Sequence, residues 1–427
     1  MSPRRTRLTM RERVWLPLEY IRTVGPLRGV TADGLRAALL GLHAADPAHH
    51  AVSRLDRDNA RWVTMTRTEF AAYVQDAVTE VNGADADFDA MTRRLHAEPR
   101  GHHPVRILVG GDTTPAGCFV ALKVAHAYGD ADPVNRLLRE LVLAAAQGRA
   151  AAFGPVPGRR LLVTKALWAE FGRRPGRWKS GLRITRAPAA VAAETVAWQP
   201  DLAVETARSA EVLAKMRVWR DANAPGVSTA AITFAAFATA LTRLGIGTAQ
   251  TGAVFLADAR RYLPKGTVVD GNFCWGQYIA PVDLADPRAV QQALKAELST
   301  GRILTMMALR EIRVALSAIE GLPAPYPARI PRDRRPELTL SNQGRHDLLA
   351  DLPWAGGPEV RVNHSVPTLS GPTNITLTTS EMAGVLHLEA TFHSSTFDRA
   401  LVARAIALVC EDPAALLSPA VAEAAGA

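Results

Sequence analysis

A histidine and an aspartate four positions apart stand out in the stretch VAHAYGDADPV, residues 124–134. Of the eleven histidines, His126 alone has an aspartate, Asp130, at this spacing. An imidazole has an unperturbed pKa of about 6.5, so it is mostly neutral at pH 7 and can accept a proton from a substrate. By chance, a chain of this composition should contain about 0.5 histidine–aspartate pairs at this spacing. The spacing alone therefore favours a histidine at a strand end, bonded to nearby backbone, over a catalytic base.

The residues around this pair predict the elements that would position it. PVRILVGG and CFVALKVA, residues 104–111 and 118–125, are typical of two strands of a hairpin that leads into His126. Asp132 and Pro133 form a typical helix start, with a carboxylate cap and a proline in the first turn. The leucines of VNRLLRELVLAAA then recur at helical spacing. We therefore expect His126 in a short loop between a strand and a helix.

Strands and helices alternate in both halves of the chain, which favours an α/β fold of two domains. We expect these domains at residues 1–190 and 191–427, joined by a crossing segment rich in glycine, proline and arginine over 147–200. The second-half elements that we expect are helices over 204–220 and 228–244, a strand over 252–258, a helical region from 286 through Leu316, strands over 336–344, 373–382 and 385–392, and a closing helix over 395–409.

Composition limits the classes of protein. The chain has 427 residues, 48% of them hydrophobic and 21% charged, which is a globular balance. No apolar run approaches the roughly 20 residues of a membrane span, and no secretory signal follows the basic N-terminus. The three cysteines, without a CxxC pair, exclude a disulfide framework and give no zinc spacing, so we expect a cytoplasmic protein without a metal site.

The net charge of +9 indicates an affinity for anions. Basic residues cluster over 159–186. This cluster fits a solvated surface with weak partners as well as it fits an anion-binding face. The candidate partners are nucleic acid, acidic lipid, a nucleotide-bearing thioester and an acidic carrier protein. We find no nucleic-acid-binding module and no aromatic stacking platform. Charge alone does not choose among the other partners.

The stretch AHAYGDA resembles the HHxxxDG motif of the condensation-domain and chloramphenicol-acetyltransferase-like superfamily, whose plant branch carries HxxxD. The second histidine of the motif matches His126 and its aspartate matches Asp130. Ala125 replaces the first histidine and Ala131 replaces the glycine. Four further stretches are similar to family segments in the same order: GLRAALLGLHAADPA, ADARRYL with GNFCWG, SNQG at 341–344, and VLHLEATFHSSTFDRALV.

The resemblance implies a V-shaped pair of chloramphenicol-acetyltransferase-like domains, with a tunnel between them and the motif loop at its centre. His126 would deprotonate or orient the attacking group, and Asp130 would hold the loop by pairing with Arg260, or else with Arg261. Cys274 is either a small buried residue or, less favoured, a nucleophile. The remaining candidates would bind substrate or shape the tunnel: Asn272, Phe273, Trp275, Ser341 and Asn342.

The resemblance also implies a function. We expect a free-standing acyltransferase that moves an acyl group from a thioester, on either coenzyme A or a phosphopantetheine carrier protein, to a hydroxyl or amine. No carrier-protein signature occurs in the chain, so a carrier would bind in trans, and no cofactor would be held permanently. Specialised-metabolite biosynthesis is the expected setting, by analogy. The alternatives are a non-catalytic recruitment module and a different base-assisted reaction in the same tunnel.

Overall fold

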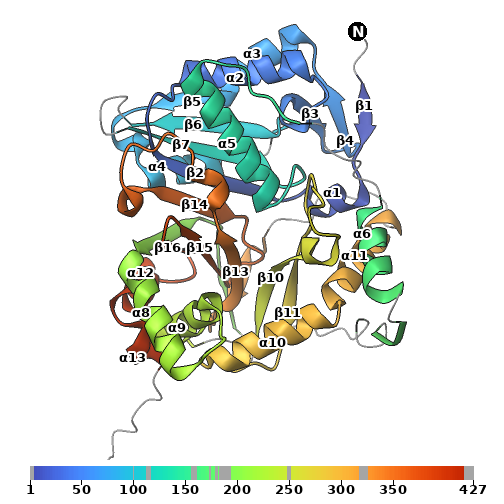
Figure 1. The fold of residues 1–427 in the computed structure, drawn as a ribbon. Helices are drawn as coiled ribbons and strands as arrows, with labels where there is room; N and C mark the ends of the chain where they lie inside the picture. Colours follow the sequence, from blue (N-terminus) through green and yellow to red (C-terminus); the bar gives the residue numbers. More distant parts are fainter. Residues whose placement is uncertain are drawn as a thin grey trace, which may run out of the picture.

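The computed structural model describes the chain in two layered halves, one above the other in Figure 1, each built on its own β-sheet. The described residues are 4–99, 101–111, 117–154, 161–172, 175–177, 181, 194–247, 252–316 and 326–417. The expected α/β fold is confirmed. The boundary expected at residues 190 and 191 lies outside the described residues. No helix in the described ranges is long and apolar enough to cross a membrane.

The upper half contains a five-stranded sheet with the order β14-β2-β7-β6-β5. Its hairpin of β6 and β7 is the one that the sequence predicts, and the two strands pair antiparallel. The strands are β2 (Glu19–Leu27), β5 (Val78–Val81), β6 (Val105–Gly110), β7 (Cys118–Ala125) and β14 (Val362–Pro367). The helices are α2 (Ala32–Ala45), α3 (Arg67–Ala77), α4 (Phe88–Ala97) and α5 (Ala131–Gln147).

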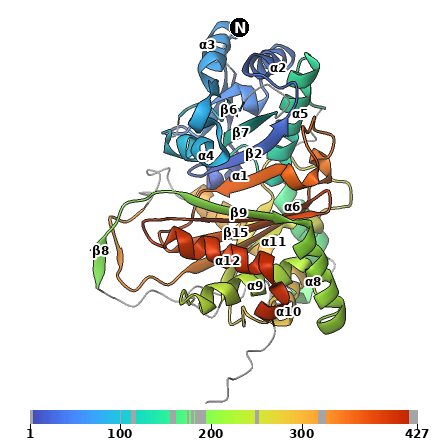
Figure 2. The same ribbon diagram turned by 90° about the vertical axis from the view of Figure 1, so that its left-hand side faces the viewer.

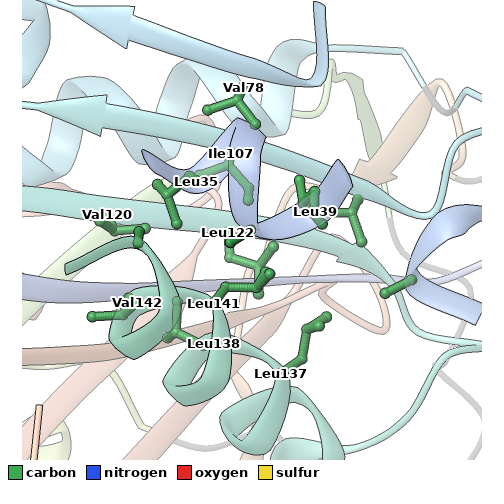
Figure 3. Close-up of a cluster of buried hydrophobic side chains, with 14 of the residues drawn as sticks. Leu35, Leu39, Val78, Ile107, Val120, Leu122, Leu137, Leu138, Leu141 and Val142 are labelled. Atoms are coloured by element: carbon green, nitrogen blue, oxygen red, sulfur yellow. The ribbon is translucent and has the colours of Figure 1, made fainter. Parts of the chain in front are cut away.

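Alternating side chains of this sheet enter two different cores, as the two-residue period of a strand requires. Ile107 and Leu122 point toward α2 and α5, whose leucines cover them (Figure 3). Leu108 and Ala121 belong instead to the core beneath α4. Shortening a fully buried leucine such as Leu138 to alanine should cost about 2–5 kcal/mol. This packing holds fixed the strand end and the helix start between which His126 lies.

A small sheet and one short helix close the upper half beside the motif loop. The three strands, in the order β1-β4-β3, are β1 (Arg5–Arg7), β3 (Ser53–Asp56) and β4 (Arg61–Thr64). Helix α1 (Met10–Trp15) begins at Thr9, whose hydroxyl accepts from the Glu12 N–H while the Glu12 carboxylate accepts from the Thr9 N–H. This reciprocal cap lets so short a helix form, and it fixes the position of Trp15.

The lower half contains a six-stranded sheet with the order β11-β10-β13-β15-β16-β9, in which β10, β13 and β15 run parallel. Figure 2 shows α12 and α8 against this sheet. The strands are β9 (Ala203–Ser209), β10 (Ala253–Asp258), β11 (Cys274–Ile279), β13 (Glu337–Arg345), β15 (Asn374–Met382) and β16 (Val385–Phe392). The helices are α8 (Ala210–Asn223), α9 (Thr229–Arg243), α10 (Pro287–Ser299), α11 (Arg302–Leu316), α12 (Arg399–Glu411) and α13 (Pro413–Leu417).

Two local predictions are wrong, those for the segment over 204–220 and for the cap of α5, and two expected regions contain details that the sequence did not predict. The segment expected as a helix over 204–220 begins as strand β9, because its backbone pairs antiparallel with β16. The helical region after residue 286 breaks into α10 and α11 at Gly301, which takes a φ of +68° that other residues rarely adopt. The crossing segment contains a short helix, α6 (Leu162–Leu167). The cap of α5 is Asp130 rather than Asp132.

Strand β14 is the connection between the halves that the sequence pattern did not predict. It comes from the second half of the chain but pairs antiparallel with β2 of the upper sheet. Asn363, for example, lies opposite Val24. The upper sheet is therefore completed by a strand more than 300 positions away along the chain, and this strand lies beside the cavities described below.

Candidate active site

His126 lies directly after β7, where the sequence places it, and is 8% exposed. Its backbone N–H donates to the carbonyl of Leu18 at 2.9 Å. Its ring stacks on Trp15, with 4.4 Å between the centroids and 25° between the planes. The ring of Tyr20 is tilted against it at 5.8 Å. Two aromatic rings therefore fix the orientation of the imidazole.

Burial lowers the pKa of His126 from its usual value. Its own carbonyl, the charge of Asp130, the side chain of Asn272 and the backbone of Gly129 each act in the opposite direction without reversing the shift. The ring is therefore neutral at pH 7, which is the form that can accept a proton. A buried neutral imidazole at the end of a strand fits a catalytic base, and it also fits a histidine bonded only to nearby backbone. The residues and cavities around His126 therefore decide between these two interpretations.

Asp130 faces away from His126 and toward the second half. Arg260 donates to both of its carboxylate oxygens, at 2.9 Å each, and the backbone N–H of Phe273 donates to Oδ2 at 2.7 Å. Oδ1 also accepts from the N–H of Asp132 and so caps α5. Burial alone would lower the pKa of Arg260, but attraction to Asp130 raises it. A bidentate pair of this kind is strong and geometrically specific.

The GNFCWG segment provides a second anchor for the motif loop. Asn272 is 1% exposed, and its Nδ2 donates to the carbonyl of His126 at 2.6 Å. Gly129 lies against this segment and leaves no room for a side chain, because a Cβ there would lie 2.3 Å from Cγ of Pro133 and 3.5 Å from Cα of Gly271. The loop on either side of His126 is thus held by both halves of the molecule.

Two cavities meet at His126. The first, of about 710 Å³, extends between α1, β10, β11 and α11. The second, of about 410 Å³, extends between the start of α5 and β13. His126, Leu256, Cys274 and Pro367 line both. The motif histidine is therefore accessible from two directions, which is the geometry that a tunnel with a central base requires.

The other predicted site residues do not all line the same cavity. Trp275 lines the first cavity, and Ser341 and Asn342 line the second. Asn272 lines neither of the two, and contacts the motif loop where we expected a substrate contact. Cys274 lines both, but burial raises the pKa of its thiol well above the usual value. The thiol is therefore protonated at pH 7 and poorly suited to act as a nucleophile.

Several residues of the site carry no signal in the sequence. Trp15 and Tyr20 contact His126 from segments more than 100 positions away. The Tyr20 hydroxyl bonds to Ser365 and accepts from Gln343, which lies on β13. The capping pattern of α1 would have predicted the helix that carries Trp15, but no local pattern predicts which ring a side chain contacts.

Most of the basic cluster at 159–186 lies outside the described residues. Arg177 is described, and its Nη1 pairs with Glu170 at 2.5 Å. Lys165 lies in α6. Among the residues that the structure describes, no group of three or more His, Cys, Asp or Glu side chains is arranged to hold a metal ion.

Comparison with solved structures identifies the fold. No protein-family model matches the chain, and no curated protein matches it in sequence. A trichothecene 15-O-acetyltransferase from Fusarium sporotrichioides superposes with a TM-score of 0.64 and 14% identity, over 97% of this chain and 95% of its own. The first condensation domain of the calcium-dependent antibiotic synthetase, bound to a substrate analogue, superposes with a TM-score of 0.60 and 15% identity, over 98% of both chains. The chain has the condensation-domain fold.

A third structure with this fold is the X-domain of teicoplanin biosynthesis, in complex with OxyB. It superposes with a TM-score of 0.53 and 17% identity, over 96% of this chain and 93% of its own. The condensation-domain fold is thus found in an acetyltransferase and in a domain that was solved with a protein partner. At these identities the likeness describes architecture, so function must be argued from the site.

Proposed function

We propose that the chain is a condensation-type acyltransferase that moves an acyl group from a thioester to a hydroxyl or amine. The observation that carries this proposal is the place of His126, a neutral buried imidazole where two cavities meet. A histidine bonded only to backbone would need no such access. The donor is an acyl group on coenzyme A or on a separate carrier protein, and the setting is cytoplasmic specialised-metabolite assembly.

The proposed reaction uses the two cavities for the two substrates. The acceptor enters one cavity and places its O–H or N–H against the imidazole, while the thioester carbonyl reaches the same point from the other. His126 takes the proton as the acceptor oxygen or nitrogen attacks the carbonyl carbon. The tetrahedral intermediate then expels the thiolate, which takes the proton from the imidazolium. Proton removal by a positioned base contributes about 10²–10⁴-fold to such a rate.

The test is single-turnover acyl transfer from a panel of acyl-coenzyme A and acyl-pantetheine thioesters to alcohols and amines. His126→Ala should lower the rate by about 10²–10⁴-fold while the protein stays folded. His43→Ala is a matched control, because His43 is also a buried histidine, at 6% exposed, but packs on Phe70 and bonds to the carbonyl of Met65. It should lower the melting temperature and leave turnover per folded molecule unchanged. The reverse pattern would show that His126 serves only in packing.

A recruitment module is the second candidate function, and the X-domain bound to OxyB is the observation that favours it. It predicts that a protein partner binds tightly while no thioester in the panel is consumed. Turnover that depends on His126 would rule it out.

A further inference from the structure

Taking up a proton puts a positive charge on His126 in a place where burial disfavours one. In the proposed reaction the proton of the acceptor moves to the imidazole and later to the departing thiolate, so an imidazolium exists between these two steps. Burial lowers the pKa of the ring, which means that the charged form is costly there. A group that stabilises the imidazolium would therefore speed the reaction.

The neighbours of His126 in the motif loop and in GNFCWG stabilise this charge only indirectly. Asp130 accepts from Arg260 through both carboxylate oxygens, and Oδ2 also accepts from the backbone N–H of Phe273. The negative charge that acts on His126 is thus accompanied by the positive charge of Arg260. Asn272 is neutral, and its Nδ2 donates to the carbonyl of His126. The ring that stacks on His126 is the remaining candidate.

The two rings that contact His126 have different orientations. The indole of Trp15 is stacked on the imidazole, with 4.4 Å between the centroids and 25° between the planes. The ring of Tyr20 is tilted by 50° at 5.8 Å, and its hydroxyl bonds to Ser365 and Gln343. An aromatic face attracts a cation within about 6 Å of its centroid, and the indole face does so best. Trp15 therefore has the position and the chemistry to contact an imidazolium.

Stacking by itself is a packing arrangement that recurs in this protein. Four other histidines stack on aromatic rings with centroids 3.7–4.6 Å apart: His43 on Phe70, His49 on Phe153, His50 on Trp62 and His103 on Tyr73. In the described part of the chain, none of these eight residues lines either cavity at His126. Trp15 and His126 both line the first cavity. This stack is therefore placed where a substrate proton can reach the imidazole.

The surroundings of Trp15 strengthen such a contact. Trp15 is the half-buried last residue of α1, and the wall of the first cavity that it lines is largely apolar. The attraction between a cation and an aromatic face grows when water is excluded. A substrate in this cavity would displace water from beside the indole. The contact is then strongest at the stage of the reaction at which the imidazolium exists.

We propose that Trp15 is a positioning residue of the base, whose indole face holds the imidazole and stabilises the imidazolium that forms when the acceptor loses its proton. The inference rests on the proposed acyl transfer and adds a residue to it. Trp15 acts through His126, because the indole itself neither gives nor takes the proton. The reciprocal cap of Thr9 and Glu12 at the start of α1 keeps the indole in place.

Other groups that can carry a charge surround His126 and stay in place when Trp15 is replaced. On α1 itself, Arg11 lies over the ring of Phe273 at 5.4 Å. The groups on the other elements are Tyr20 on β2, Asp130 before α5 with its partner Arg260, Cys274 on β11, and Arg310 and Arg313 on α11. A change in the pKa of His126 after substitution of Trp15 alone therefore reports on the indole.

The test is the rate at which diethyl pyrocarbonate modifies His126 as a function of pH, followed by mass spectrometry of the digested protein. Only the neutral imidazole reacts, so the midpoint of the rate profile gives the pKa. Trp15→Leu should lower this midpoint by about one pH unit, and Trp15→Phe by less, because a phenyl face attracts a cation less than an indole face does. Loss of packing alone would act in the opposite direction, since water entering the widened cavity favours the charged form and raises the pKa.

Two controls and a rate measurement accompany this profile. Single-turnover acyl transfer at pH 8 should fall by up to about tenfold in Trp15→Leu and by about threefold in Trp15→Phe. Phe153→Leu makes a similar change beneath His49 and should alter neither the midpoint nor the rate. The exposed His102 serves as the reference in each digest, and its midpoint should be the same in all variants.

A midpoint of His126 that rises or stays unchanged in Trp15→Leu would overturn the proposal, because the stack would then serve only in packing. Modification by diethyl pyrocarbonate needs no thioester, so this result is independent of turnover. A midpoint that shifts as expected in a protein that consumes no thioester would overturn the proposed function and leave the contact between Trp15 and the imidazolium standing. Turnover with an unmoved midpoint would overturn this inference alone.

Discussion

Two arginines, Arg22 fully buried and Arg260 half-buried, connect the halves of the molecule in different ways. Arg260 meets the carboxylate of Asp130 through two bonds of 2.9 Å. Arg22 is 0% exposed, and its guanidinium donates to the amide oxygens of Gln343 and Asn363. Attraction to Asp130 raises the pKa of Arg260, whereas burial lowers the pKa of Arg22. One link is an ion pair, and the other is a cation held by neutral groups.

The difference indicates what each link does. The Arg260 link holds the loop that carries His126, so it should affect the rate as well as the stability. The Arg22 link holds Gln343 and contacts His346, both of which line the wall of the second cavity. Its loss should affect the stability and substrate affinity more than the rate constant. The predictions below test this division in order of decreasing effect.

Asp130→Ala should lower the free energy of unfolding by up to about 3–5 kcal/mol, because the half-buried Arg260 loses its bidentate partner and keeps only Asp258, at 3.2 Å, and Asp132, at 3.9 Å. The single-turnover rate should fall as well, since the motif loop loses its anchor. Arg260→Ala should do the same, and the double variant should cost less than the sum of the two. Urea denaturation and single-turnover kinetics on the same preparations measure both. Additive losses would mean that the pair does not couple.

Arg22→Met should lower the free energy of unfolding by about 2–3 kcal/mol, because buried acceptors on two partners lose their donor. Turnover per folded molecule should stay within about threefold of wild type under saturating substrate. The control is Arg404→Met, an exposed arginine paired with Glu411, which should change neither quantity. A rate loss as large as that of Asp130→Ala would contradict the division between the two links.

The Arg22 link should also make the protein acid-sensitive. Burial and the nearby charge of Arg22 lower the pKa of His346 to about 2. Below about pH 6.5 an unfolded His346 takes up a proton that the folded one does not, so stability falls as the pH falls. The loss from this one group is at most about 1.4 kcal/mol per pH unit. Denaturation at pH 7, 6 and 5 should give a shallower slope for His346→Gln than for wild type. Equal slopes would contradict this account.

Asn272→Ala tests the second anchor of the motif loop, which is the hydrogen bond from Asn272 to the carbonyl of His126. Its bond to the carbonyl of His126 should contribute about 0.5–1.5 kcal/mol to stability. The rate should fall by up to about tenfold, because the imidazole is held less firmly. Asn342→Ala is the control, since Asn342 lines the second cavity without contacting the motif loop in the described contacts. A loss of stability with an unchanged rate would make Asn272 purely structural.

The sequence predicted the local elements of the site better than its contacts. The strand before His126 follows from an apolar run typical of a hairpin, and the helix after Asp130 follows from leucines at helical spacing, which are local effects. The pairing of Arg260 with Asp130 was predicted from the family resemblance and not from the spacing of residues. Strand β14 pairs with β2 across the two halves, and no periodicity in either strand specifies the partner. The Arg22 link was missed for the same reason, because its partners are more than 300 positions away.

Two errors have specific physical causes. Residues 203–209 contain no helix breaker, but the open edge of β16 pairs with them as a strand. Aspartate is a common helix cap, so Asp132 was a reasonable candidate, but Asp130 occupies the cap position. Its carboxylate accepts both from the first turn of α5 and from Arg260. Tertiary contacts override local preference at both places.

The pH dependence of single-turnover acyl transfer tests whether His126 is the base. Burial lowers the pKa of His126, so the rate should rise with pH to a plateau with an apparent pKa below about 6.5. The rise should be absent from the residual activity of His126→Ala. An apparent pKa above about 6.5 that persists unchanged in His126→Ala, at a wild-type rate, would contradict the account.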